Sequence, residues 1–162
     1  MLLGAGGAAR AIAVELVLAG VAELTIVNRT PARAAEVAAL VTAARDIPVQ
    51  THAWKEPVSV PEQIDVLVNC TSIGLGDAEA LVPVTAGSLR PDLVVADVIP
   101  NPPQTKLLRA AAAAGCPTVD GLGMLVGQGV LGVGFWTGRE LTPATAPDLV
   151  AAMRQALEEV FA

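Results

Sequence analysis

The chain has 162 residues, a length that suits one domain. Hydrophobic residues make up 53% of the sequence and charged residues only 16%, which excludes a disordered chain. Ten basic residues against sixteen acidic ones give a net charge of −6, which argues against a nucleic-acid partner because phosphates require a basic surface. Thirty alanines, against two Phe, two Trp and no Tyr, indicate a core of small side chains between closely packed layers.

The predicted elements alternate between strands and helices from the first residue. Residues 1–3 form an apolar strand that leads into a glycine-rich turn, and residues 8–19 form a helix that Gly20 caps. We expect further strands at 23–28, 49–54, 65–69, 93–97 and 118–120, and further helices at 31–45, 105–114 and 148–161. This alternation predicts an α/β fold: a Rossmann-like, doubly wound parallel sheet over residues 1–120, followed by C-terminal helices over residues 121–162.

A phosphate-binding fingerprint follows the first strand. The run Gly4-Ala5-Gly6-Gly7-Ala8-Ala9 has the form G-x-G-x-x-A. In this pattern Gly4 permits a tight turn, and Gly6 lets the backbone approach a pyrophosphate. The helix that follows offers free N–H groups and a partial positive charge at its N-terminus. Because the fingerprint lies between an apolar strand and a helix, we predict a nucleotide site here rather than a structural turn alone.

The end of the second strand distinguishes NADP from NAD. An NAD site carries Asp or Glu there for the ribose 2′-hydroxyl, but this chain has Asn28, Arg29 and Thr30, with Arg33 one turn later. Two guanidiniums, an amide and a hydroxyl can bind a 2′-phosphate through charge-assisted hydrogen bonds, which a carboxylate would repel. The alternative is that Thr30 only caps the helix beginning at Pro31 and that both arginines are solvated. The sequence favours NADP as the cofactor.

Five motifs occur together and in order along the chain. They are Gly4-Ala-Gly-Gly-Ala8, Asn28-Arg-Thr-x-x-Arg33, Asn69-x-Thr-Ser-x-Gly74, Asp97 with Asn101-Pro-x-x-Thr105, and Asp120-Gly-x-x-Met-Leu-x-x-Gln128. The set resembles the shikimate dehydrogenase family, specifically its NADP-binding portion and its C-terminal helices, and the match covers essentially the whole chain. The resemblance implies that residues 4–8 hold the pyrophosphate of NADP. It likewise implies that the 2′-phosphate is held by Asn28, Arg29, Thr30 and Arg33.

The resemblance also implies roles for residues farther along the chain. It places five residues near the ribose and nicotinamide of the cofactor: Thr71, Ser72, Val98, Gly121 and Met124. It directs Gln128 toward a hydroxyl of the substrate. The implied activity is that of an oxidoreductase of the shikimate pathway in aromatic amino acid biosynthesis, which transfers hydride between NADP and a ring hydroxy or keto acid such as shikimate and 3-dehydroshikimate.

Two departures from the family pattern affect the expected substrate and activity. The family carries Tyr three residues after the position of Asp97, where this chain has Pro100, so a related ring acid is an alternative substrate. In the family, the domain that binds the substrate and supplies the catalytic Lys and Asp precedes the glycine loop, and only three residues precede Gly4 here. We therefore assign no catalytic residue to this chain and expect the isolated chain to be inactive.

Two alternative functions remain open at this point. One is a non-catalytic NADP-binding module or a truncated product, which the missing front domain supports. The other is the NADPH domain of a glutamyl-tRNA reductase-like protein, which also pairs a glycine loop with Asn-Arg-Thr. The motif from Asp120 to Gln128 argues against this second alternative.

The remaining residues give no sign of metal or nucleophilic chemistry. Cys70 and Cys116 form no zinc pattern and are expected to be buried thiols in a reducing cytoplasm. His52 has no carboxylate or serine at motif spacing and is expected at the surface. The longest apolar stretch, residues 122–136, is shorter than the ~20 residues of a bilayer span, so we expect no membrane association.

The C-terminal segment is the expected interaction surface. Seven glycines lie between residues 121 and 138, among large apolar side chains. In the family, this segment packs against the substrate domain, so without that domain its apolar face would be exposed. We expect it either to pair with a second copy of the chain, as a homodimer through the C-terminal helices, or to be covered by the helix at 148–161.

Overall fold

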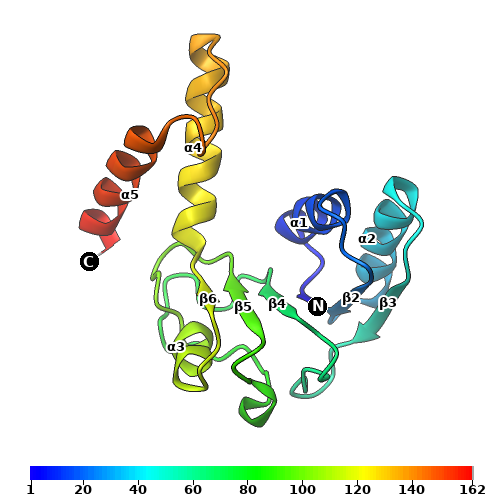
Figure 1. Cartoon of the computed structure of the whole chain (residues 1–162). Coiled ribbons are helices and arrows are strands. Elements are labelled where there is room, and N and C mark those ends of the chain that lie inside the picture. The colour runs from blue at the N-terminus through cyan, green and yellow to red at the C-terminus, as the bar shows by residue number, and fades with distance from the viewer. Residues whose placement is uncertain (162) are drawn as a thin grey trace.

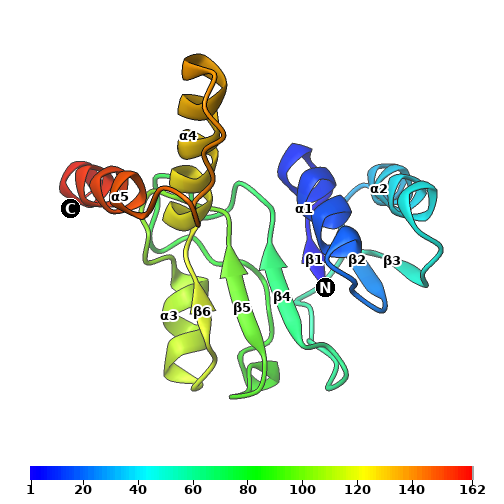
Figure 2. The same cartoon turned by 45° about the horizontal axis from the view of Figure 1, so that its top comes forward.

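The computed structural model describes residues 1–161, which form a six-stranded parallel sheet flanked by helices (Figures 1 and 2). The strands are β1 (Leu2–Leu3), β2 (Leu24–Asn28), β3 (Val49–Ala53), β4 (Val66–Asn69), β5 (Val94–Asp97) and β6 (Thr118–Val119). The helices are α1 (Gly7–Leu18), α2 (Pro31–Ala44), α3 (Lys106–Ala113), α4 (Gly121–Thr137) and α5 (Pro147–Phe161), with a short 3₁₀ turn at Ala86–Ser88.

The strand order confirms the predicted doubly wound fold. The sheet runs β3-β2-β1-β4-β5-β6, and every neighbouring pair is parallel. The chain therefore winds outward from β1 to β3 in one direction and from β4 to β6 in the other. A crevice forms at the carboxyl ends of the strands where the winding direction reverses, which in this sheet is between β1 and β4.

The core consists of one apolar layer on each face of the sheet. Leu2 and Leu3 of β1 point to opposite faces, as neighbouring strand residues must, and both are fully buried. On the Leu2 face, α1 and α2 pack through small side chains, including Ala9 and Ala13. On the Leu3 face, α3 packs through Leu107 and its neighbours. The abundance of alanine predicted this close packing of helices on the sheet.

The expected boundaries of the helices and strands agree with the structure to within one or two residues. The capping interactions of three residues at the ends of elements differ from those expected. The C-cap of α1 is Ala19, and Gly20 follows it with φ +96°. Asp120 lies outside β6 and caps α4, where its Oδ1 accepts a hydrogen bond from the Gly123 N–H at 3.1 Å. Thr30 occupies the N-cap position of α2, but its side chain makes no capping hydrogen bond. Thr30 is therefore the N-cap residue of α2, as its position before Pro31 indicates, although its hydroxyl takes no part in the capping.

The glycine-rich segment folds as a single helix, α4, that projects beyond the sheet (Figure 1). Its glycines allow the following chain to approach closely. A Cβ on Gly129 would lie 3.2 Å from Sδ of Met153 in α5, and one on Gly127 would lie 3.8 Å from Pro143. At the far end of α4, Phe135 and Trp136 remain 85% and 86% exposed. The terminal helix α5 therefore covers part of α4, which was one of the two expected arrangements. The far end of α4 remains uncovered.

Candidate functional site

The glycine loop connects the central strand to α1 with the geometry of a phosphate cradle. Gly4 has φ +102°, and a Cβ there would lie 3.0 Å from the Cys70 carbonyl oxygen, so this position requires glycine. A Cβ on Gly6 or Gly7 would meet nothing within 4 Å, so the space above these residues is open. The N-cap residue of α1 is Gly6, which has no side chain to occupy the first amides of the helix, and the first turn of α1 contains no acidic residue. The first amides of α1 are therefore free to bind an anion.

A cavity of about 680 Å³ lies beside this loop, over the carboxyl ends of the central strands. It brings together eight of the predicted site residues: Gly4, Ala5, Gly6, Asn28, Arg29, Arg33, Thr71 and Ser72. Its other lining residues are Trp54, Lys55, Glu56, Pro57, Cys70, Ile73, Leu81 and Pro83. Its volume is typical of pockets that hold small molecules and cofactors.

One corner of the cavity is positively charged. Arg29, Arg33 and Lys55 line it, against the single carboxylate of Glu56. Sequence reasoning missed Lys55 because it follows β3, far along the chain from the Asn-Arg-Thr motif. The parallel pairing of β2 with β3 brings the two strand ends together, and the Trp54 N–H donates to the Asn28 carbonyl at 3.0 Å. The predicted strand order could have suggested this proximity, since residues that follow adjacent parallel strands share one edge of the sheet.

Trp54 was also missed as a site residue. Its ring lines the cavity and packs against the apolar layer that contains Leu3. The indole Nε1 is buried and has no hydrogen-bond partner among residues 1–161. A buried donor without a partner is unfavourable, and a bound nucleotide with its many acceptor atoms could supply one. The open cradle, the cationic corner and this orphaned donor all fit a phosphorylated nucleotide.

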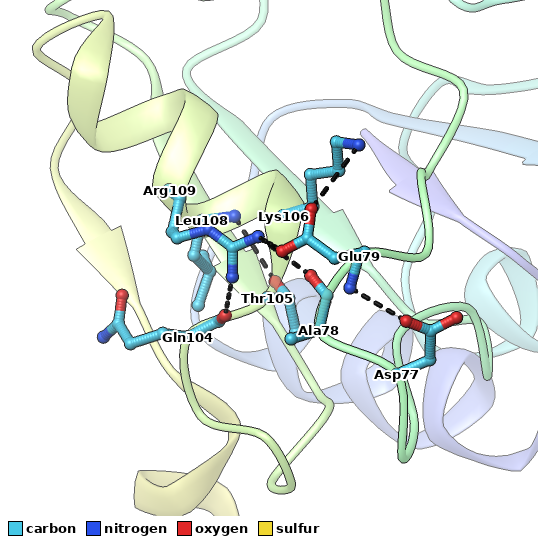
Figure 3. A network of polar contacts seen from close by, with 8 residues as sticks. All are labelled: Asp77, Ala78, Glu79, Gln104, Thr105, Lys106, Leu108 and Arg109. Carbon is cyan, nitrogen blue, oxygen red and sulfur yellow. Dashed lines mark hydrogen bonds and ion pairs between the residues drawn. The ribbon is translucent and has the colours of Figure 1, made fainter.

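The segment that follows β4 forms one wall of the cavity and is attached to α3 (Figure 3). Glu79 pairs with Arg109 and lies 3.7 Å from Nζ of Lys106. Arg109 also donates to the carbonyl oxygens of Ala78, at 3.1 Å, and of Gln104, at 2.7 Å. These contacts attach the middle of the segment, at residues 78–79, to α3. Residues 70–73 at its start and Leu81 and Pro83 at its end line the cavity.

Seven predicted site residues do not line the cavity: Gly7, Ala8, Thr30, Val98, Gly121, Met124 and Gln128. Gly7 and Ala8 begin α1 directly after the lining loop. Val98 and Gly121 lie against each other, since a Cβ on Gly121 would be 2.7 Å from the Val98 carbonyl carbon. The Val98 N–H donates to the Asn69 carbonyl at 3.1 Å, which places this pair next to the end of β4. Met124 and Gln128 are exposed on α4.

The cysteines and the histidine have no nucleophilic or metal-binding arrangement. Burial, followed by the negative charge of Asp97, raises the pKa of Cys70 to about 12, so this cavity residue remains a neutral thiol. Cys116 is also buried and free, and His52 is exposed on β3, as expected. Within residues 1–161, no group of His, Cys, Asp or Glu side chains could hold a metal ion. None of the helices described is both long and apolar enough to span a bilayer.

Comparison with known proteins agrees with this geometry. Residues 1–75 match the family described as Shikimate / quinate 5-dehydrogenase. The shikimate dehydrogenase (NADP(+)) of Alkaliphilus metalliredigens is 40% identical over 147 residues, which span 87% of this chain and 51% of that protein. Among solved structures, the ligand-free 5-ketofructose reductase of Gluconobacter sp. strain CHM43 is 54% identical with a TM-score of 0.89, over 99% of this chain and 55% of that one. A shikimate dehydrogenase in complex with NADP+ is 32% identical with a TM-score of 0.81, over 99% of this chain and 54% of that one.

The curated relatives and the solved structures match this chain over a similar share of their own lengths. The chain is matched along most or all of its length, and it spans about half the length of the curated relatives it matches. The resemblance to the shikimate dehydrogenase family is therefore confirmed, and this chain corresponds to the NADP-binding half of those enzymes.

Proposed function

We propose that this chain binds NADP(H) and presents it for hydride transfer to or from a polyhydroxylated substrate. The observation that carries the proposal is the single cavity that joins the open phosphate cradle at α1 to a corner lined by Arg29 and Arg33. No acidic residue stands at the end of β2, where an NAD site would carry one. When bound, NADP(H) supplies the hydride or accepts it.

Each part of the cofactor has proposed partners on this chain. The amides of residues 4–8 face the pyrophosphate, which the helix dipole of α1 also favours. The 2′-phosphate is held by Asn28, Arg29, Thr30 and Arg33, with Lys55 as a further cation. Toward the ribose and nicotinamide lie Thr71, Ser72, Val98, Gly121 and Met124. Of these, Thr71 and Ser72 line the cavity directly, and the other three lie around the adjoining ends of β5 and β6.

The substrate class has two candidates. The family match favours a ring hydroxy or keto acid, such as shikimate and 3-dehydroshikimate, in the shikimate pathway. The second candidate is an open or cyclic sugar ketone such as 5-ketofructose. It is favoured by the 54% identity to the Gluconobacter reductase, against 40% to the Alkaliphilus shikimate dehydrogenase and 32% to the enzyme solved with NADP+. Pro100, at a position where the family carries a substrate-contacting Tyr, is consistent with this second candidate.

In this proposal the chain binds the cofactor, and a second structural unit binds the substrate. Residues 1–120 bind the cofactor, and residues 121–162 carry Gln128 toward the substrate and contact the unit that holds the substrate. The exposed tip of α4 offers an apolar face for that unit or for a second copy of this chain. The isolated chain would then bind NADP(H) in the cytoplasm without turnover, because its cavity contains no proton-transferring Lys and Asp pair.

Cofactor choice is tested by calorimetric titration of the chain with NADP+ and with NAD+. In the double variant Arg29→Ala, Arg33→Ala, we expect NADP+ affinity to fall by two or more orders of magnitude, since each charge-assisted contact contributes roughly 1.5–3 kcal/mol. NAD+ affinity should change several-fold at most. Arg139→Ala, which removes one exposed cation at the far end of α4, is the matched control. Equal losses for both cofactors would refute the assignment of this corner to the 2′-phosphate.

The substrate class is tested with two chimaeras, in which this chain follows the preceding half of the Gluconobacter reductase or of the Alkaliphilus enzyme. NADPH oxidation is measured with 5-ketofructose and with 3-dehydroshikimate. If α4 and Pro100 suit a sugar ketone, only the first chimaera should turn over its substrate. Turnover by the second chimaera alone would favour the ring acid.

A further inference from the structure

We propose that the buried pair Asn69 and Asp97 positions the cofactor-binding turn at residues 70–73, a role that rests on the proposed binding of NADP. Neither residue lines the cavity, and their exposed fractions are 0% and 3%. Asn69 ends β4 and Asp97 ends β5, so the parallel pairing of these strands places them opposite each other. They are positioning residues, because they act on the cofactor only through the turn.

Asp97 holds Asn69 in one orientation. The Asp97 Oδ1 accepts hydrogen bonds from Nδ2 of Asn69 at 3.0 Å and from the Ile99 N–H at 3.1 Å. Its Oδ2 accepts from the Thr105 hydroxyl at 2.8 Å. Because Oδ1 already accepts from the Ile99 backbone N–H, it acts as an acceptor toward Asn69 as well, so the amide NH₂ of Asn69 faces Asp97 and the amide oxygen faces away.

The amide oxygen of Asn69 then defines the turn. It accepts hydrogen bonds from the Thr71 N–H at 3.1 Å and from the Thr71 hydroxyl at 2.7 Å. The Thr71 hydroxyl in turn accepts from the Ile73 N–H at 3.1 Å, and Nδ2 of Asn69 lies 3.3 Å from the Ile73 carbonyl oxygen. A flipped amide would place an NH₂ group against these Thr71 donors and leave buried groups unpaired, which is unfavourable.

This network changes the expected role of Thr71. Its hydroxyl proton is donated to Asn69 and its oxygen accepts from Ile73, so the hydroxyl is used inside the protein. Its Cγ2 would lie 3.1 Å from a Cβ on Gly4, so the methyl group packs against the glycine loop. Ser72 is exposed at the cavity, and its hydroxyl makes no hydrogen bond among the described residues. Thr71 therefore shapes the turn, and Ser72 is the hydroxyl presented to the cofactor.

The two ends of the cavity allow this role to be separated from a general effect on folding. The turn follows β4, whereas Arg29 and Arg33 follow β2, and β1 lies between these strands. Adenosine 2′-monophosphate reaches only the adenine and 2′-phosphate end, but NADP+ extends to the turn. A displaced turn should therefore weaken NADP+ binding and leave 2′-AMP binding unchanged.

The experiment titrates both ligands into the wild-type chain and into Asn69→Ala, Asp97→Ala and Asp97→Asn. For the two alanine variants we expect NADP+ affinity to fall roughly tenfold, the scale of one lost hydrogen bond, with 2′-AMP affinity within about twofold of wild type. Asp97→Asn should restore NADP+ affinity, because its amide oxygen can accept from Asn69 and Ile99 while its NH₂ donates to Thr105. Should Asn69→Ala fail to fold, Asn69→Ser enters the same titrations with the same expectation.

Thr105→Val is the matched control for stability. It removes the hydroxyl on the other side of Asp97, 1% exposed and outside the cavity, so it should lower the melting temperature without changing NADP+ affinity. The inference is overturned if Asn69→Ala binds NADP+ as the wild type does. It is also overturned if 2′-AMP affinity falls in parallel, or if Thr105→Val weakens NADP+ binding equally. A wild-type chain that binds no NADP+ would refute the proposed function as well.

Discussion

The start of α4 offers a sharp test of how tightly the cofactor half is assembled. Gly121 lies against the turn that follows β5, where a Cβ would be 2.7 Å from the Val98 carbonyl carbon and closer still to the carbonyl group of Ile99. These obstacles are backbone atoms, held in place by the bond from Ile99 N–H to Asp97. Gly121→Ala must therefore displace either α4 or the end of β5.

The cost of this substitution follows from overpacking. Inserting a methyl group against a fixed backbone costs about 1–3 kcal/mol, and we expect a value near the upper end because no flexible side chain can yield. For a chain of this length the melting temperature falls by roughly 2–4 °C per kcal/mol, so Gly121→Ala should lower it by roughly 4–12 °C. The measurement is thermal unfolding followed by circular dichroism.

Gly132→Ala is the matched control in the same helix. A Cβ there meets nothing within 4 Å, so the substitution should raise the melting temperature, since alanine is up to ~1 kcal/mol more favourable than glycine inside a helix. A Gly121→Ala variant that melts within about 1 °C of the wild type would refute this close packing of Gly121 against the turn after β5.

Three further predictions concern charge and assembly. Burial raises the pKa of Asp97 in the folded state, so folding is favoured when Asp97 is protonated. This contribution to the free energy of unfolding is fully present below the pKa of ~3.9 in the unfolded chain, and it is lost as pH rises through the pKa of the folded state. Denaturant midpoints measured across that pH range should therefore vary less for Asp97→Asn than for the wild type. Asp120→Ala removes both the cap of α4 and the ion pair with Arg154, whose Nη2 lies 2.5 Å from Oδ2 of Asp120. It should therefore cost about 1–2 kcal/mol of stability and speed hydrogen exchange in α5. If the tip of α4 joins two copies of the chain, light scattering should detect a dimer that Leu131→Asp with Phe135→Asp converts to a monomer; a monomeric wild type would contradict this.

The predicted residues that the structure brings together at the cavity belong to local sequence patterns. The glycine loop was recognisable because Gly4 needs a positive φ and sits between an apolar strand and a helix, all within a few residues. The cationic corner was recognisable because Arg29 and Arg33 share one motif, and both line the cavity. The position of Thr30 as the N-cap of α2 was recognisable for an equally local reason, because Pro31 favours the first turn of a helix. The Thr30 carbonyl accepts a hydrogen bond from the Arg33 N–H at 3.1 Å, whereas the Thr30 hydroxyl forms no bond to α2.

The residues that sequence reasoning missed are brought together only by the sheet. Lys55 and Trp54 reach the cavity because β3 lies beside β2, and no motif links them to the glycine loop. Asn69 and Asp97 were both visible as motif residues, yet their hydrogen bond exists only because β4 and β5 are paired in register. Single-residue patterns can suggest that such polar residues matter, but not which of them touch.

The roles of two residues in the C-terminal segment were expected from resemblance alone. Met124 and Gln128 were placed near the cofactor and substrate by resemblance, and both are exposed on a helix that projects away from the sheet (Figure 2). Val126 and Val130 of α4 are buried, and Met153 of α5 packs close to Gly129 of the same helix, but Phe135 and Trp136 remain exposed. An apolar surface of this kind normally meets a partner. The roles that the resemblance implies for Met124 and Gln128 therefore require a second surface packed against α4, which would enclose the two exposed side chains.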